Sequence, residues 1–164
     1  MNRKNETLTA NKRIALRGIL IALALILSYA ESFFPLSFIA PGVKIGLANI
    51  VTIYALERLS VRDALVISLL RILLAAVLFG NPAVMVYSLS GALLSILVMS
   101  IFSQMPQLGT LGISISGAVA HNIGQCIAAA ALLQNLKVFV YLPMLLAAGV
   151  ITGTISGLIL KSGV

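Results

Sequence analysis

The residues that could do chemistry in this sequence are a few polar side chains inside long apolar stretches. Arg71 lies eight residues after Asp63, or about 12 Å along a helix, in the middle of one stretch. His121 lies comparably deep in a later one, with Asn122 beside it and Gln125 one turn further on the same face. An ionisable group at membrane depth costs at least ~2.5–3.5 kcal/mol, so it usually has a partner or a function.

Three more polar residues accompany this group. Asn49 lies in the outer half of the second apolar stretch, while Glu31 and Lys44 stand at the outer ends of the first and second. Together these side chains predict a substrate-binding pocket that opens toward the outer side, with Arg71 as its fixed positive charge. A structural interpretation is also open, in which Arg71 pairs with Glu31 or a helix carbonyl and His121 bonds to a neighbouring helix.

The sequence lacks the motifs of several enzyme classes. Asp63 is the only aspartate, so no Asp-rich pair can hold magnesium and a diphosphate, and no glycine-rich phosphate loop is present. A single histidine and a single cysteine, Cys126, argue against a dedicated zinc site and a disulfide. No serine lies in a Gly-x-Ser-x-Gly motif. We expect a protein that is not an enzyme, with no cofactor and no metal, and with Cys126 as a small core residue.

The elements that position these residues follow from the composition. Of the 164 residues 60% are hydrophobic and 9% are charged, and the mean hydropathy is +1.13. Soluble domains are ~45–50% apolar and ~25% charged, and a small domain cannot bury so many apolar side chains. These values exclude an ordinary soluble enzyme and predict an all-helical integral membrane protein.

Six apolar runs approach the ~20 residues that cross a bilayer. We expect a six-transmembrane-helix bundle that forms a single membrane domain over residues 1–164, with an N-terminal segment at 1–13 and an outer loop at 32–42. The second and third runs are short and contain polar residues. The predicted spans are Ile14–Ala30, Val43–Leu56, Ala64–Phe79, Ala83–Phe102, Leu108–Leu133 and Val138–Leu160.

The basic residues are distributed unevenly around these spans. Because cytoplasmic loops carry an excess of Lys and Arg, the distribution predicts cytoplasmic N- and C-termini. It also argues against nucleic acid as a partner, since no aromatic residues are interleaved with the charges. Ser28-Tyr29-Ala30 could end a signal peptide, but the five spans that follow favour an uncleaved anchor. The inner side holds Arg3, Lys4, Lys12, Arg13, Arg17, Arg58, Arg62 and Lys161, and the outer side holds Lys44 and Lys137.

Small residues at helical spacing predict where helices approach closely, because lipid gives no hydrophobic drive for association. The fifth and sixth spans have such stripes, which we expect to pack inside the bundle. The first span has one on which we expect a partner protein to dock. The stripes are Gly112, Ser116, Ala120, Gly124 and Ala128, then Gly149, Gly153 and Gly157, and in the first span Ala15, Gly18 and Ala22.

Two segments have a resemblance to a known family. They are Arg13-Ile-Ala-Leu-Arg-Gly-Ile-Leu-Ile-Ala-Leu-Ala24 and Pro41-Gly-Val-Lys-Ile-Gly-Leu-Ala-Asn-Ile50. In these segments, in length and in span count, the chain resembles the Gx transporter family, also labelled heptaprenyl diphosphate synthase component I. That family is similar to the substrate-binding S components of energy-coupling factor (ECF) transporters.

The resemblance implies an S-component-like bundle with a ligand beneath the outer loop, and a first helix that docks on an ECF transmembrane subunit with its ATPases. Gly18-x-x-x-Ala22 stands where that docking face usually has Ala-x-x-x-Ala. The implied function is uptake of a small vitamin-like, isoprenoid-precursor or quinone-precursor molecule across a prokaryotic plasma membrane. The alternative is a non-catalytic membrane subunit or scaffold, either for a polyprenyl (heptaprenyl) diphosphate synthase or for flavin- or quinone-linked extracellular electron transfer.

Overall fold

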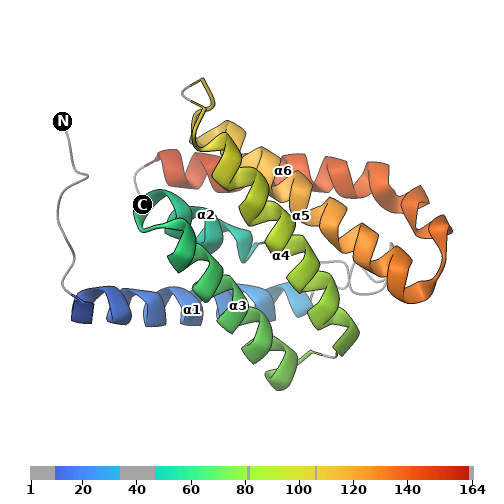
Figure 1. The fold of residues 1–164 in the computed structure, drawn as a ribbon, viewed down its shortest axis with the longest axis horizontal. Helices are drawn as coiled ribbons and strands as arrows, with labels where there is room; N and C mark the ends of the chain where they lie inside the picture. The colour runs from blue at the N-terminus through green and yellow to red at the C-terminus, as the bar shows by residue number, and fades with distance from the viewer. Residues whose placement is uncertain (1–9, 34–46, 81, 106, 163–164) are drawn as a thin grey trace.

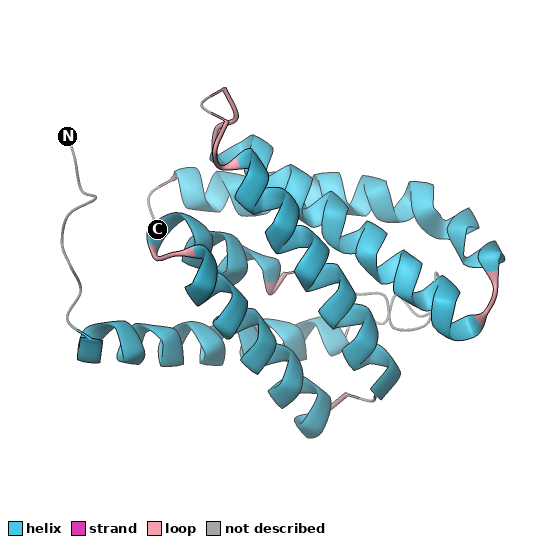
Figure 2. Ribbon diagram, viewed as in Figure 1, coloured by secondary structure: helices cyan, strands magenta, loops and turns pink. Residues whose placement is uncertain are grey.

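The computed structural model describes residues 10–33, 47–80, 82–105 and 107–162, and every regular element in these ranges is a helix (Figures 1 and 2). The expectation of an all-helical protein is confirmed. The elements are α1 (Ala10–Ser32), α2 (Asn49–Arg58), α3 (Val61–Leu78), α4 (Pro82–Phe102), α5 (Thr110–Leu133), the 3-10 helix η2 (Leu136–Tyr141) and α6 (Leu142–Lys161).

Among the residues that the structure describes, four helical segments are long and apolar enough to cross a membrane, so the chain is a membrane protein. They are Asn11–Ser32, Pro82–Phe102, Thr110–Leu133 and Leu136–Lys161, which correspond to four of the predicted spans. The helix α2 has 10 residues and extends about 15 Å, half of a ~30 Å hydrocarbon core. It is shorter than the predicted span Val43–Leu56, of which residues 43–46 lie outside the described ranges.

Local sequence accounts for several helix ends. Ser60 is the N-cap of α3, and its hydroxyl accepts a hydrogen bond from the backbone N–H of Asp63. Gln134 ends α5 in the left-handed conformation, with φ at 49°. A proline in the first turn of α6 suits a position where no backbone N–H is needed inside the helix.

Glycines allow α4, α5 and α6 to pack with their backbones in contact. A Cβ on Gly153 of α6 would lie 2.6 Å from Ile115 Cα of α5, and one on Gly124 of α5 would lie 2.7 Å from the Ser90 carbonyl oxygen of α4. Gly149 and Gly157 meet α5 in the same way. We predicted that the small residues of the fifth and sixth spans pack inside the bundle, and these four glycines confirm it.

Two glycines of α5 depart from this prediction. A Cβ on Gly112 would meet only the Leu108 side chain, which precedes it on the same chain, so this glycine marks no helix contact. Gly117 was not in the predicted stripe, yet a Cβ there would lie 2.4 Å from the sulfur of Met99 on α4.

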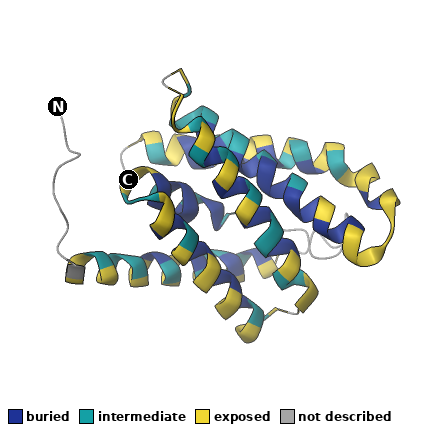
Figure 3. Ribbon diagram, viewed as in Figure 1, coloured by how far each residue is buried: buried dark blue, intermediate teal, exposed yellow. Residues whose placement is uncertain are grey.

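The helix α1 packs against α3 and α2 and leaves a wide face uncovered (Figure 3). Leu20 and Ala24 are buried in a core with Ile53 and Ile67 of α2 and α3. The uncovered face presents large aliphatic side chains, such as Ile19, which is 65% exposed. In a membrane protein such a face meets lipid or another membrane helix.

Candidate functional site

Arg71 lies at the centre of a buried polar cluster between α1 and α3. Its Nη1 donates a hydrogen bond to Ser28 Oγ at 3.0 Å, and the charge of Glu31 stabilises the guanidinium. Arg71 and Glu31 are 6% and 4% exposed. Glu31 Oε1 also accepts a hydrogen bond from the backbone N–H of Leu47, just before α2. The cluster thus joins three helical segments around one buried cation.

Arg71 retains hydrogen-bonding capacity on its other side. Its Nε has no hydrogen-bond partner among the described residues. The side chain lines a pocket of about 10 Å³ between α3 and α4, together with Ser88 and Met85. This volume suits about one water molecule. Arg71 therefore combines an unused donor with a place in the lining of a small crevice, which could hold a polar atom of a ligand or a bound water.

The polar residues of α5 form a second buried group. The Nε2 atoms of His121 and Gln125 are 3.0 Å apart, and Asn122 Nδ2 donates a hydrogen bond to the carbonyl of Leu145 on α6 at 2.7 Å. All three side chains are at most 5% exposed. Gln125 Oε1 has no hydrogen-bond partner among the described residues. Asn122 thus holds α5 to α6, whereas the hydrogen bond between Gln125 Nε2 and His121 Nε2 lies within α5.

One face of α4 passes all of these groups in turn. Ser88 lines the pocket at Arg71, and a Cβ on Gly91 would lie 3.0 Å from the His121 ring. Ser95 Oγ lies 3.5 Å from Asn49 Oδ1. Since Ser88, Gly91 and Ser95 are spaced at i, i+3 and i+7, they share that face. The predicted site residues thus lie along a continuous buried polar layer, although the pocket at Arg71 does not include His121.

Two further sets of predicted residues do not form part of this layer as the structure describes it. Lys44 and most of the outer loop 32–42 fall outside the described residues. Ala15, Gly18 and Ala22 are all exposed on the uncovered face of α1, and nothing lies within 4 Å of a Cβ built on Gly18. The face predicted for a partner protein is therefore open in this chain.

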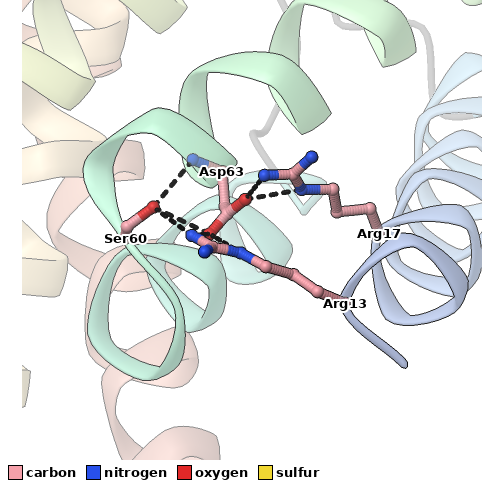
Figure 4. Close-up of polar contacts among 4 residues, drawn as sticks. All are labelled: Arg13, Arg17, Ser60 and Asp63. Carbon is pink, nitrogen blue, oxygen red and sulfur yellow. Dashed lines mark hydrogen bonds and ion pairs between the residues drawn. The ribbon is translucent and has the colours of Figure 1, made fainter. Parts of the chain in front are cut away.

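A polar cluster that the sequence interpretation missed joins the start of α1 to the start of α3 (Figure 4). Asp63 is completely buried, and its carboxylate pairs with Arg13, at 2.5 Å, and with Arg17. Arg13 Nη2 also donates a hydrogen bond to Ser60 Oγ at 3.2 Å, and Ser60 Oγ donates one to Asp63 Oδ2 at 2.7 Å. The sequence analysis counts Arg13 and Arg17 only among the basic residues of the inner side, and it places Asp63 just before the predicted span Ala64–Phe79.

The signal for this cluster was present in the sequence. Arg13 and Arg17 are one helical turn apart, so both side chains lie on one face of α1. Ser60-x-x-Asp63 has the spacing of a helix N-cap followed by an acidic residue in the first turn. Burial of the Asp63 carboxyl acts to raise its pKa, but hydrogen bonds from Arg13, Ser60 and Arg17 outweigh this and lower the pKa below 3.8.

Two further expectations concern Cys126 and metal binding. Cys126 is buried at 1% exposure in the core between α5 and η2, which confirms it as a core residue. Within the described ranges, no group of three or more His, Cys, Asp or Glu side chains could hold a metal ion.

Comparison with known proteins gives one match. The family model described as heptaprenyl diphosphate synthase component I matches residues 20–162. The match covers all of α2 to α6 and most of α1. No curated protein and no solved structure matches the chain.

Proposed function

Because the chain belongs to the heptaprenyl diphosphate synthase component I family, also known as the Gx transporter family, we propose that it is a ligand-binding membrane component rather than a catalyst. In this proposal it is the substrate-binding component of an ECF-type transporter. It captures a small vitamin-like, isoprenoid-precursor or quinone-precursor molecule on the outer side of a prokaryotic plasma membrane. The chain crosses the membrane six times, with both termini in the cytoplasm.

The observation that carries this proposal is Arg71. A buried cation inside a membrane bundle needs compensation, and the described residues leave its Nε without a hydrogen-bond partner. A carboxylate or phosphate of a ligand at the crevice beside Ser88 would supply that partner. Entry of a ligand larger than a water requires α3 and α4 to separate there, because the pocket is about 10 Å³.

The partner proposal depends on the exposed small residues of α1. Gly18 has no neighbour within 4 Å, so a helix of another protein could approach the α1 backbone there. In the proposed orientation, this face docks on an ECF transmembrane subunit that is coupled to two ATPases.

The experiment is a tagged pull-down of the full chain from native membranes in a mild detergent, followed by mass spectrometry of proteins and small molecules. We expect an ECF transmembrane subunit with ATPases, and a small molecule that is lost from Arg71→Ala but kept in the matched variant Arg62→Ala. Gly18→Leu should lose the protein partner, whereas Ile26→Leu on the same helix should keep it. A small molecule retained by Arg71→Ala would contradict the assignment of Arg71.

A second candidate function follows from the family's description as a synthase component. In this candidate the chain is a non-catalytic membrane subunit for a separate polyprenyl diphosphate synthase, or for a flavin- or quinone-linked enzyme. Recovery of such an enzyme without ATPases in the same pull-down would support this candidate and exclude the ECF role. Recovery of neither set of partners would contradict both.

A further inference from the structure

The cluster of Arg13, Arg17, Ser60 and Asp63 has an excess of positive charge. Asp63 is completely buried and supplies one negative charge, whereas the two guanidinium groups that contact it supply two positive charges. Within the described ranges, both ion pairs of the chain use Asp63, so neither arginine has a second acidic partner there. A group with one negative charge would therefore complete the cluster.

Each guanidinium group keeps hydrogen-bond donors that the carboxylate does not use. Nε and Nη2 of both arginines contact Asp63, and neither Nη1 atom has a contact among the described residues. The side chains of Arg13 and Arg17 are 42% and 32% exposed. Figure 4 shows both arginines reaching the carboxylate from α1, with the third nitrogen of Arg17 pointing away from it. Because Asp63 already orients the two groups, they lose little freedom when a further acceptor binds.

The cluster lies at one end of the membrane-spanning segment of α1. That segment is Asn11–Ser32, and Arg13 and Arg17 follow its first residue by about 3 and 9 Å along the helix. The headgroup region of a bilayer lies at the ends of such a segment, and basic side chains near helix ends extend toward it. The free donors of the two arginines therefore lie at the level of lipid phosphates.

Apolar surface continues from the cluster along both helices. Because α1 and α3 begin at the cluster and the rings of Tyr29 and Phe79 meet near their other ends, the two helices run in the same general direction. Ile14 of α1 is exposed, as are Val66 and Leu70 of α3, one and two turns beyond the carboxylate. These side chains offer contact to an acyl chain whose headgroup lies at the arginines, and a water-soluble anion would make no use of them.

We propose that Arg13 and Arg17, oriented by Asp63, bind the phosphate of an anionic membrane phospholipid such as phosphatidylglycerol. The phosphodiester oxygens accept hydrogen bonds from the exposed guanidinium donors, and an acyl chain lies against α1 and α3. The single negative charge of this lipid matches the excess charge of the cluster. A zwitterionic lipid has the same phosphate, but it also carries an ammonium group that the arginines repel. The site is separate from Arg71 and does not depend on the ligand or the partner proposed above.

The test uses the full chain purified in a mild detergent. Phosphatidylglycerol and phosphatidylcholine are added in equal amounts, and native mass spectrometry measures which lipid stays bound. We expect a preference for phosphatidylglycerol. Since one basic residue near a membrane surface contributes about fivefold to the binding of an anionic lipid, Arg17→Gln should lower the preference by about that factor. Asp63→Asn should instead raise the preference, because it leaves two uncompensated cations.

A matched variant tests whether the effect belongs to this cluster. Lys161→Gln removes an exposed cation from the end of α6, which packs against neither α1 nor α3. It should leave the preference unchanged. An equal loss of preference in Lys161→Gln and Arg17→Gln would show attraction to the overall charge of the protein and would overturn the proposal.

The opposite directions expected for Arg17→Gln and Asp63→Asn separate lipid binding from a purely structural role. Both substitutions weaken the same contact between α1 and α3, so a cluster that only joined the helices would respond to both in the same way. Protection of the buried Cys126 thiol from a maleimide, at the temperature of the binding measurement, reports that each variant is folded.

Three further results would overturn the proposal. The first is a wild-type chain with no preference for phosphatidylglycerol. The second is a folded Arg17→Gln protein that keeps the preference, or a folded Asp63→Asn protein in which it falls. The third is displacement of the lipid by excess inorganic phosphate, which would assign the cluster to a soluble anion instead.

Discussion

Replacement of Gly153 by alanine should destabilise the contact between α5 and α6. The added Cβ would lie 2.6 Å from Ile115 Cα, about 0.8 Å short of the 3.4 Å at which ordinary contact begins. The atom that it meets belongs to the backbone, so no side chain can rotate away and the two helices must separate. Separation also lengthens the 2.6 Å hydrogen bond from Ser114 Oγ to the Gly153 carbonyl.

The magnitude follows from three terms. Overpacking costs about 1–3 kcal/mol, and a weakened buried hydrogen bond costs about 1 kcal/mol. Alanine offsets about 0.5–1 kcal/mol of this, because it is the better helix former. The net expectation is a loss of about 1–3 kcal/mol. The same substitution at Gly18, where nothing lies within 4 Å, should leave stability unchanged or raise it by up to about 1 kcal/mol.

The assay uses the chain's only cysteine. Cys126 is 1% exposed, so a maleimide dye that fluoresces on reaction reports unfolding as the purified protein is heated in detergent. At about 2–4 °C per kcal/mol, the Gly153→Ala midpoint should fall by about 2–12 °C. A Gly153→Ala protein as stable as the wild type would refute the inference that backbone contact at this glycine limits the approach of α5 and α6. If Gly18→Ala also destabilised the protein, the loss of stability could not be attributed to close backbone contact, because no atom lies near Gly18.

Three further predictions concern other contacts. Asp63→Asn should lower the midpoint by removing the anion shared by Arg13 and Arg17. Because folding lowers the pKa of Asp63 from 3.8, its carboxylate stabilises the folded protein above that pH. This stabilisation is lost as the pH falls toward the folded pKa. Circular dichroism melts should show the loss in the wild type and not in Asp63→Asn. Gln134→Gly should raise the free energy of unfolding by about 0.5–1 kcal/mol, and the midpoint with it, since glycine adopts φ of 49° without strain; an unchanged or lower midpoint would contradict this. Asn122→Ala should cost about 1–3 kcal/mol by leaving the Leu145 carbonyl without its side-chain donor, and a cost below 0.5 kcal/mol would show that water replaces it.

The sequence predicted the helical membrane architecture because hydropathy and helical spacing are local properties. The small residues of the sixth span at i, i+4 and i+8 were enough to predict its packing face, since glycine has few other reasons to recur at that spacing. Gly117 was missed because its partner, Met99, lies on another helix, and the approach of two helices cannot be read from one of them.

The candidate site was predicted in part. Arg71, His121, Asn122, Gln125, Asn49 and Glu31 were selected for polarity at depth, and all six are buried. Their division into groups was not predictable, because it depends on how α1, α3 and α5 pack along one face of α4. Ser28 and Ser88 were overlooked for a related reason: serine is common in membrane helices, and only contact with Arg71 distinguishes these two.

The contact of Arg13 and Arg17 with Asp63 has a consequence for the order of events during synthesis. Arg13 precedes Asp63 by 50 residues, which take on the order of 3–10 s to make at ~5–20 residues per second. During that interval α1 exists without its acidic partner, and in the proposed orientation both guanidinium groups would hold the start of the helix on the cytoplasmic side. Once Asp63 emerges, the same two side chains secure α3 against α1. In the proposed topology, the same two arginines thus act first as orientation signals and afterwards as tertiary contacts between α1 and α3.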